Sequence, residues 1–171
     1  MTKHAVVIAL AGILSTGSLL AAKTVTVSLK DAKGQDVGTA KIADAEKGGV
    51  TILLKVKNLP PGDHAAHIHQ NAKCDAPGFT TAGGHFNPDM KKHGLDNPDG
   101  PHAGDMNNFK VDRKGKAKVL LVDTRVNLGD DMHSVFANGG TALMIHAKAD
   151  DYKTDPTGNA GDRIACGTIT K

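Results

Sequence analysis

The chain has 171 residues, 39% of them hydrophobic, and a formal net charge of +3 from 21 basic and 18 acidic side chains. This length suits one domain, and the balanced charge excludes a disordered polyelectrolyte. Nucleic-acid binding is not expected either, because basic residues are scattered and aromatic residues make up only 3% of the chain. Nine histidines stand out. We therefore expect histidine to carry the chemistry.

The first 22 residues have the pattern of a secretory signal peptide. Lys3 supplies positive charge, residues 5–14 are apolar, and small residues end the segment at Ala21 and Ala22. An uncleaved anchor is the alternative, but the apolar run is shorter than the roughly 20 residues that span a bilayer. We expect cleavage near Ala22, a periplasmic or otherwise exported location, and a mature domain of residues 23–171 without a membrane segment.

Residues after this segment alternate polar and apolar side chains, as half-buried β-strands do. Val25, Val27 and Leu29 form the first such series. Further aliphatic or β-branched segments bounded by turn residues are expected to be strands: 51–57, 116–123, 141–146 and 164–170. No stretch after the signal keeps a helical period. The pattern predicts an all-β antiparallel sandwich or barrel.

Two cysteines, Cys74 and Cys166, are present. Export favours a disulfide between them, because thiols outside the cytoplasm tend to be oxidised. Two buried free thiols or a metal site with sulfur ligands are the alternatives. Neither cysteine lies in a C-x-x-C pair, which weakens the metal alternative.

Residues 71–104 interrupt the strand pattern with a long segment rich in Gly, Pro, Asp and Lys. A loop of this length inside a compact domain needs something to order it. Cys74 could hold one part covalently. A metal could order the rest through nearby side chains: His85, His93, His102 and Asp105.

Two further histidines, His67 and His69, lie one residue apart in the strand-like run 65–69. Their imidazoles would share one face of the strand, while Ile68 would point to the core. His146 ends a distant predicted strand. Together with the loop residues, this makes six histidines and one carboxylate. Two four-coordinate metals need eight ligand bonds, so seven residues suffice only if one imidazole binds both metals.

The sequence resembles copper/zinc superoxide dismutase, of the bacterial periplasmic type, from His64 to Gly167. Order, spacing and flanking residues all agree in the motifs that carry the resemblance: His67-Ile68-His69, Gly84-His85-Phe86-Asn87-Pro88, His93-Gly94, His102-Ala103-Gly104-Asp105, His146-Ala147-Lys148-Ala149-Asp150-Asp151 and Gly158-Asn159-Ala160-Gly161-Asp162-Arg163-Ile164-Ala165-Cys166-Gly167.

The resemblance implies an immunoglobulin-like Greek-key sandwich or barrel with long metal-ordered loops. The implied copper ligands are His67, His69, His85 and His146. The implied zinc ligands are His85, His93, His102 and Asp105. It further implies that Asp150 hydrogen-bonds one histidine of each metal, that Arg163 binds the anionic substrate, and that Cys74 and Cys166 form a disulfide.

The implied activity is dismutation of superoxide to oxygen and hydrogen peroxide by a redox-cycling copper, with His85 as both the bridge to a structural zinc and a proton donor. Imidazole ligands suit both metals. A non-enzymatic periplasmic copper/zinc buffer is the alternative, which would use the same ligands but would not need Arg163. Superoxide is the expected partner, and a homodimer stays open because its interface cannot be read from a sequence.

Substrate steering departs from the family pattern. Pro156 stands where family members often carry a lysine, and Asp162 places an acid beside Arg163. Weaker steering, or steering by Lys148 and Lys153, is therefore expected.

The remaining histidines are not expected to bind metal. His4 lies in the predicted signal, and His133 lies in a polar turn. His64 precedes the strand of His67 and is predicted to be a hydrogen-bonded structural residue.

Overall fold

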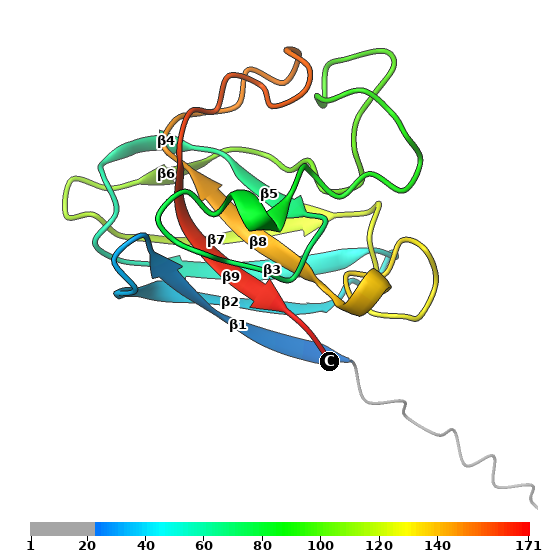
Figure 1. The fold of residues 1–171 in the computed structure, drawn as a ribbon, viewed down its shortest axis with the longest axis horizontal. Coiled ribbons are helices and arrows are strands. Elements are labelled where there is room, and N and C mark those ends of the chain that lie inside the picture. Colours follow the sequence, from blue (N-terminus) through cyan, green and yellow to red (C-terminus); the bar gives the residue numbers. More distant parts are fainter. Residues whose placement is uncertain (1–22) are drawn as a thin grey trace, which may run out of the picture.

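The computed structural model describes residues 23–171, and the predicted signal peptide lies outside the described residues (Figure 1). Nearly all regular structure in this part of the chain is β-strand, with two short 3-10 helices. None of the helices described is long and apolar enough to cross a membrane. The predicted all-β class is therefore confirmed.

Seven strands form one antiparallel sheet in the order β5-β8-β9-β1-β2-β3-β7, and β4 pairs with β6 in a second sheet. The pairs β9–β1, β5–β8 and β3–β7 join strands distant in sequence, as Greek-key connections do. The strand bounds are β1 Thr24–Asp31, β2 Asp36–Asp44, β3 Val50–Val56, β4 Gly62–His64, β5 Ala66–His69, β6 Phe109–Val111, β7 Ala117–Asp123, β8 Thr141–His146 and β9 Arg163–Ile169.

The core is formed mainly by buried side chains of the seven-stranded sheet, together with Phe109 and Val111 of β6. Strand β3 shows the principle, because its alternate residues Val50, Ile52, Leu54 and Val56 are buried. Each such side chain stabilises the fold by about 1.5–3 kcal/mol when fully buried. Aliphatic residues dominate this core, as the strand pattern predicts.

The predicted strands are all present, but β2, β4 and β6 are not among the segments predicted. In β2 the side chains of Val37, Ala40 and Ile42 are buried, and Gly38 interrupts their alternation. The φ angle of Gly38 is 144°, and a Cβ there would lie 2.1 Å from the carbonyl oxygen of Lys55. Strands β2 and β3 therefore approach closely at Gly38, and the glycine that this approach requires interrupts the period of two. Strands β4 and β6 have only three residues each.

Two long loops, residues 70–108 and 147–162, lie side by side at one end of the sheet (Figure 1). Loop 70–108 contains the 3-10 helix η1 (Thr80–Ala82), and η2 (Ala137–Gly139) precedes β8. A disulfide joins Cys74 in loop 70–108 to Cys166 in β9. The predicted disulfide is therefore present in the structure, and these two loops hold most of the polar residues described next.

Candidate metal centre

Strand β5 presents His67 and His69 on one face, while Ile68 packs into the core. Its partner β8 ends at His146, whose backbone N–H donates a 3.0 Å hydrogen bond to the carbonyl oxygen of Ala65. The adjacent strands thereby bring His146 to the two β5 histidines. His67 and His69 thus share one face of β5, as expected.

Loop 70–108 supplies the other side chains of the centre. Backbone bridging places His85 opposite His69. At the turn after His102, Asp105 lies completely buried. Gly104 permits this turn, because a Cβ there would lie 2.3 Å from the carbonyl oxygen of Ile68. The loop therefore runs directly over strand β5.

Potential ligand atoms gather in two groups of four residues, with a third group of His67, His93 and Asp150 between them, and within each group these atoms lie within 4.8 Å of one another. The strand group consists of His67, His69, His85 and His146. The loop group consists of His85, His93, His102 and Asp105. All seven residues are buried, and His85 belongs to both groups.

The two ring nitrogens of His85 face different groups. Its Nδ1 atom lies 2.9 Å from Asp105 Oδ1 and 3.3 Å from His102 Nδ1. Its Nε2 atom is buried and has no hydrogen-bond partner, and the same is true of His67 Nδ1 in the strand group. A buried polar atom without a partner is costly unless something else satisfies it. These two nitrogens therefore fit a metal in the strand group.

Burial keeps the strand group neutral in the metal-free protein. Burial lowers the pKa of His67 and His69, and it lowers the pKa of His85 and His146 to about 4. A neutral imidazole keeps the lone pair that a metal requires. At neutral pH these rings are therefore ready to bind a cation without first losing a proton.

The loop group contains an anionic carboxylate. Burial alone would raise the pKa of Asp105, but hydrogen bonds with His102, His85 and His93 hold it well below its usual range. Burial opposes protonation of His93, yet the bonds to Asp105 and Asp150 raise its pKa to about 9. One anionic oxygen ligand with three imidazoles is a suitable donor set for zinc.

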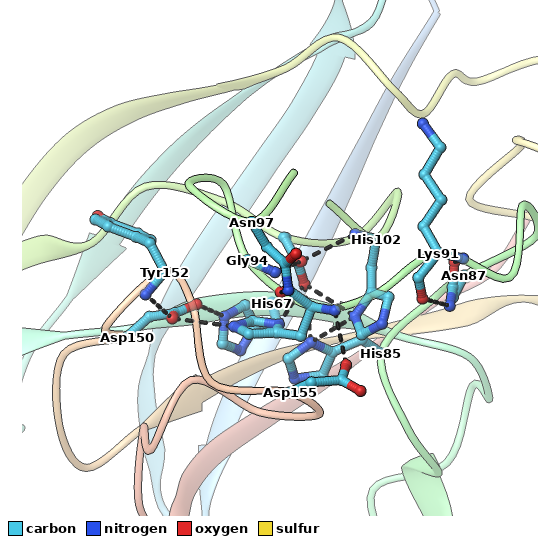
Figure 2. A network of polar contacts seen from close by, with 12 residues as sticks. His67, His85, Asn87, Lys91, Gly94, Asn97, His102, Asp150, Tyr152 and Asp155 are labelled. Carbon is cyan, nitrogen blue, oxygen red and sulfur yellow. Dashed lines mark hydrogen bonds and ion pairs between the residues drawn. The ribbon is translucent and has the colours of Figure 1, made fainter. Parts of the chain in front are cut away.

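Asp150 connects the two groups through hydrogen bonds (Figure 2). Its Oδ2 atom lies 2.8 Å from His67 Nε2, and its Oδ1 atom lies 3.0 Å from His93 Nε2. The sequence reasoning missed the residues that hold this carboxylate. Asn108 pairs with both the N–H and the C=O of Asp150, and the Tyr152 N–H donates to its Oδ1 at 2.6 Å. No spacing rule in the sequence pointed to either residue.

Arg163 lies beside the strand group, because β9 places it opposite His146. Its guanidinium donates 2.7 Å hydrogen bonds to the carbonyl oxygens of Phe79 and Gly83. The Gly83 oxygen also accepts a 2.9 Å bond from Nδ1 of His69. The guanidinium is thus held in place and remains partly exposed.

The remaining described histidines lie outside both groups. His64 is buried, with its ring nitrogens 2.7 Å from the carbonyl oxygen of His146 and 2.8 Å from that of Pro60. This confirms the predicted structural role. His133 pairs with Asp89 at 3.1 Å on the surface. His4 lies outside the described residues.

Comparison with known proteins gives one consistent family. The profile of copper/zinc superoxide dismutase (SODC) matches residues 37–169. A protein of Aquifex aeolicus named superoxide dismutase [Cu-Zn] 1 is 47% identical over 163 residues, covering 94% of this chain and 96% of that protein. A superoxide dismutase [Cu-Zn] of Caulobacter vibrioides is 36% identical over 147 residues and covers 84% of each chain.

Solved structures show the same similarity. A SOD-like protein from Bacillus subtilis superposes with a TM-score of 0.82 at 38% identity, over 84% of this chain and 97% of that one. The Cu/Zn superoxide dismutase from Brucella abortus gives a TM-score of 0.68 at 29% identity, over 86% and 99% of the chains.

Proposed function

Because this chain belongs to the copper/zinc superoxide dismutase family, we propose that its two groups of buried side chains hold the copper and the zinc with which it converts superoxide to oxygen and hydrogen peroxide. The strand group would hold copper, through His67, His69, His85 and His146. The loop group would hold zinc, through His85, His93, His102 and Asp105.

The shared residue His85 carries this assignment. One of its ring nitrogens faces Asp105 and the other is buried without a hydrogen-bond partner. When bound, copper supplies one-electron redox chemistry, and zinc, which lacks an accessible redox state, supplies charge and order. His85 Nε2 is the atom that we assign to hold a proton and pass it to the reduced substrate. Dismutation consumes two protons for every two superoxide anions, so a proton donor beside the bound substrate is required.

Arg163 is the proposed anion-binding residue. A guanidinium offers positive charge and a fork of N–H donors, yet it does not compete as a metal ligand. Hydrogen bonds to the uncharged carbonyl groups of Phe79 and Gly83 keep it oriented. We propose that the exposed Lys148 and Lys153 assist in attracting the substrate, in place of the lysine that Pro156 replaces.

A copper or zinc buffer is not favoured. Storage of a metal requires the ligands but gives no reason to hold Arg163 beside them. Family membership also indicates an oxidoreductase.

We further propose that residues 1–22 are a cleaved signal and that residues 23–171 form an exported enzyme. Lys3 and the apolar run 5–14 support this proposal.

Replacing one residue that belongs to the strand group alone tests the assignment. His146→Ala should abolish superoxide dismutation and copper binding, while one equivalent of zinc remains, because the loop group is intact. Metal analysis of the purified mature chain, coupled to a superoxide assay, measures both. His133→Ala removes a surface histidine and should change neither. Full turnover by His146→Ala would show that the copper site is wrongly assigned.

A further inference from the structure

We propose that Asp155 is a positioning residue that fastens His93 to loop 147–162 and thereby sets the zinc affinity of the loop group. The inference rests on the proposed assignment of His93 to zinc. It concerns the backbone of this residue, whereas Asp150 acts on the imidazole ring.

The backbone of His93 is held by side chains. His93 is completely buried and lies outside any strand or helix. Its N–H donates a 2.8 Å hydrogen bond to Oδ1 of Asp155, and its C=O accepts a 2.9 Å bond from Nδ2 of Asn97. A buried backbone amide needs a partner, and no sheet provides one here. Asp155 is therefore the partner that this N–H depends on.

The two loops also contact each other close to His93. The Asp96 N–H donates a 3.0 Å hydrogen bond to the carbonyl oxygen of Tyr152. A Cβ on Gly94 would lie 2.1 Å from that oxygen. Figure 2 shows Gly94, Asn97, Tyr152 and Asp155 in the same region as the imidazoles. The segments around His93 and Tyr152 are thus in direct contact.

The bond to His93 matters more than the ion pair that Asp155 also makes. Oδ2 of Asp155 lies 3.3 Å from Nζ of Lys92, but these side chains are 36% and 59% exposed. Exposed pairs of this kind contribute little to stability. The bond that lies next to the metal group is the one between Oδ1 and the His93 N–H.

Loop 147–162 therefore holds His93 at two points, its ring through Asp150 and its backbone through Asp155. Partners that orient a metal ligand typically change metal affinity by about 10–100-fold. Binding is reciprocal, so zinc on His93 should also stabilise the contact of loop 147–162 with loop 70–108.

Three variants test the proposal: Asp155→Ala, Asp155→Asn and Lys92→Gln. Zinc affinity is measured by competition with a chelator, and Co²⁺ absorption in the visible range reports the ligand geometry. Asp155→Ala should weaken zinc binding by about 10–100-fold and alter the Co²⁺ spectrum. Asp155→Asn keeps an oxygen acceptor for the His93 N–H and should restore most of the affinity. Lys92→Gln removes only the ion pair and should match the wild type.

Hydrogen exchange of the amides in residues 151–159 supplies a second measurement. Zinc should protect these amides in the wild-type protein and in Lys92→Gln, but much less in Asp155→Ala. Unchanged zinc affinity in Asp155→Ala, or equal losses in Lys92→Gln, would overturn the proposal. His93→Ala separates the two hypotheses, because undiminished zinc binding in that variant would overturn the zinc assignment itself.

Discussion

Arg163 illustrates how a single residue can be prepared for an anion. Its two hydrogen bonds go to the backbone oxygens of Phe79 and Gly83, which carry no net charge. The Gly83 oxygen also accepts from His69, which belongs to the strand group. The position of the guanidinium is thus linked to that of a proposed copper ligand.

Arg163→Ala should lower kcat/KM for superoxide by about 10–100-fold and leave both metals bound. A hydrogen bond to a charged group contributes about 1.5–3 kcal/mol, and each 1.4 kcal/mol is a factor of ten. Pulse radiolysis at several salt concentrations measures the rate, whose salt dependence should also decrease. Arg163→Lys keeps the charge, and its kcat/KM should lie between those of the wild type and Arg163→Ala. Loss of copper from Arg163→Ala would assign the residue a structural role instead.

Residue spacing predicts part of the candidate site, because His67 and His69 share a strand face and the two-metal arithmetic requires a shared ring. The choice of His85 as that ring, and the roles of Asp150 and Arg163, come from the family resemblance. Asn108 and Asp155 could not be predicted in this way. Each acts through contacts between loops that are distant in sequence, and neither has a spacing that identifies it.

The disulfide connects two elements of different character. Cys166 belongs to strand β9, whereas Cys74 belongs to loop 70–108, which has little regular structure of its own. The bond spans 92 positions in the sequence. The same loop carries the carbonyl groups of Phe79 and Gly83 that hold Arg163, so the bond anchors part of the proposed substrate site to the sheet.

The double variant Cys74→Ala/Cys166→Ala should lower the free energy of unfolding of the metal-free protein by about 2–5 kcal/mol, because cross-linking so long a loop restricts the unfolded chain. Urea unfolding of both proteins measures the difference. Wild-type protein treated with a reductant is the matched control and should behave like the variant. Equal stability of all three would show that other contacts hold the loop.

Strand prediction succeeds where one face of an element is continuously buried. β3 and β8 are aliphatic over most of their length, and turn residues mark their ends. Strand β2 is not predicted because Gly38 interrupts its alternation of buried and exposed residues, and β4 and β6 are too short to show such an alternation. The long loop at residues 71–104 could be located but its path could not be predicted, since that path depends on the disulfide and on Asp105.

At the scale of the whole molecule, several buried titratable histidines lie close together in the strand and loop groups. Burial lowers the pKa of His85 and His146 to about 4, and it also lowers the pKa of His67 and His69. In the unfolded chain these rings titrate near pH 6.5. Protons therefore bind the unfolded chain preferentially between about pH 6.5 and 4. His93 acts in the opposite direction, because hydrogen bonds outweigh its burial and raise its pKa to about 9.

The metal-free protein should consequently lose stability as the pH falls from about 6.5 toward 4, because four histidines with lowered pKa values outweigh Asp123, whose pKa burial raises to about 6. The contribution of His93 is complete below about pH 6.5 and is lost as the pH rises through about 9, which places maximum stability near neutral pH. Urea unfolding of the metal-free protein at pH 5, 7 and 9 measures this profile, and His133→Ala should leave it unchanged. Greater stability at pH 5 than at pH 7 would contradict the neutral state of the strand group. Loading with zinc should remove the alkaline loss, because a metal-bound His93 no longer titrates.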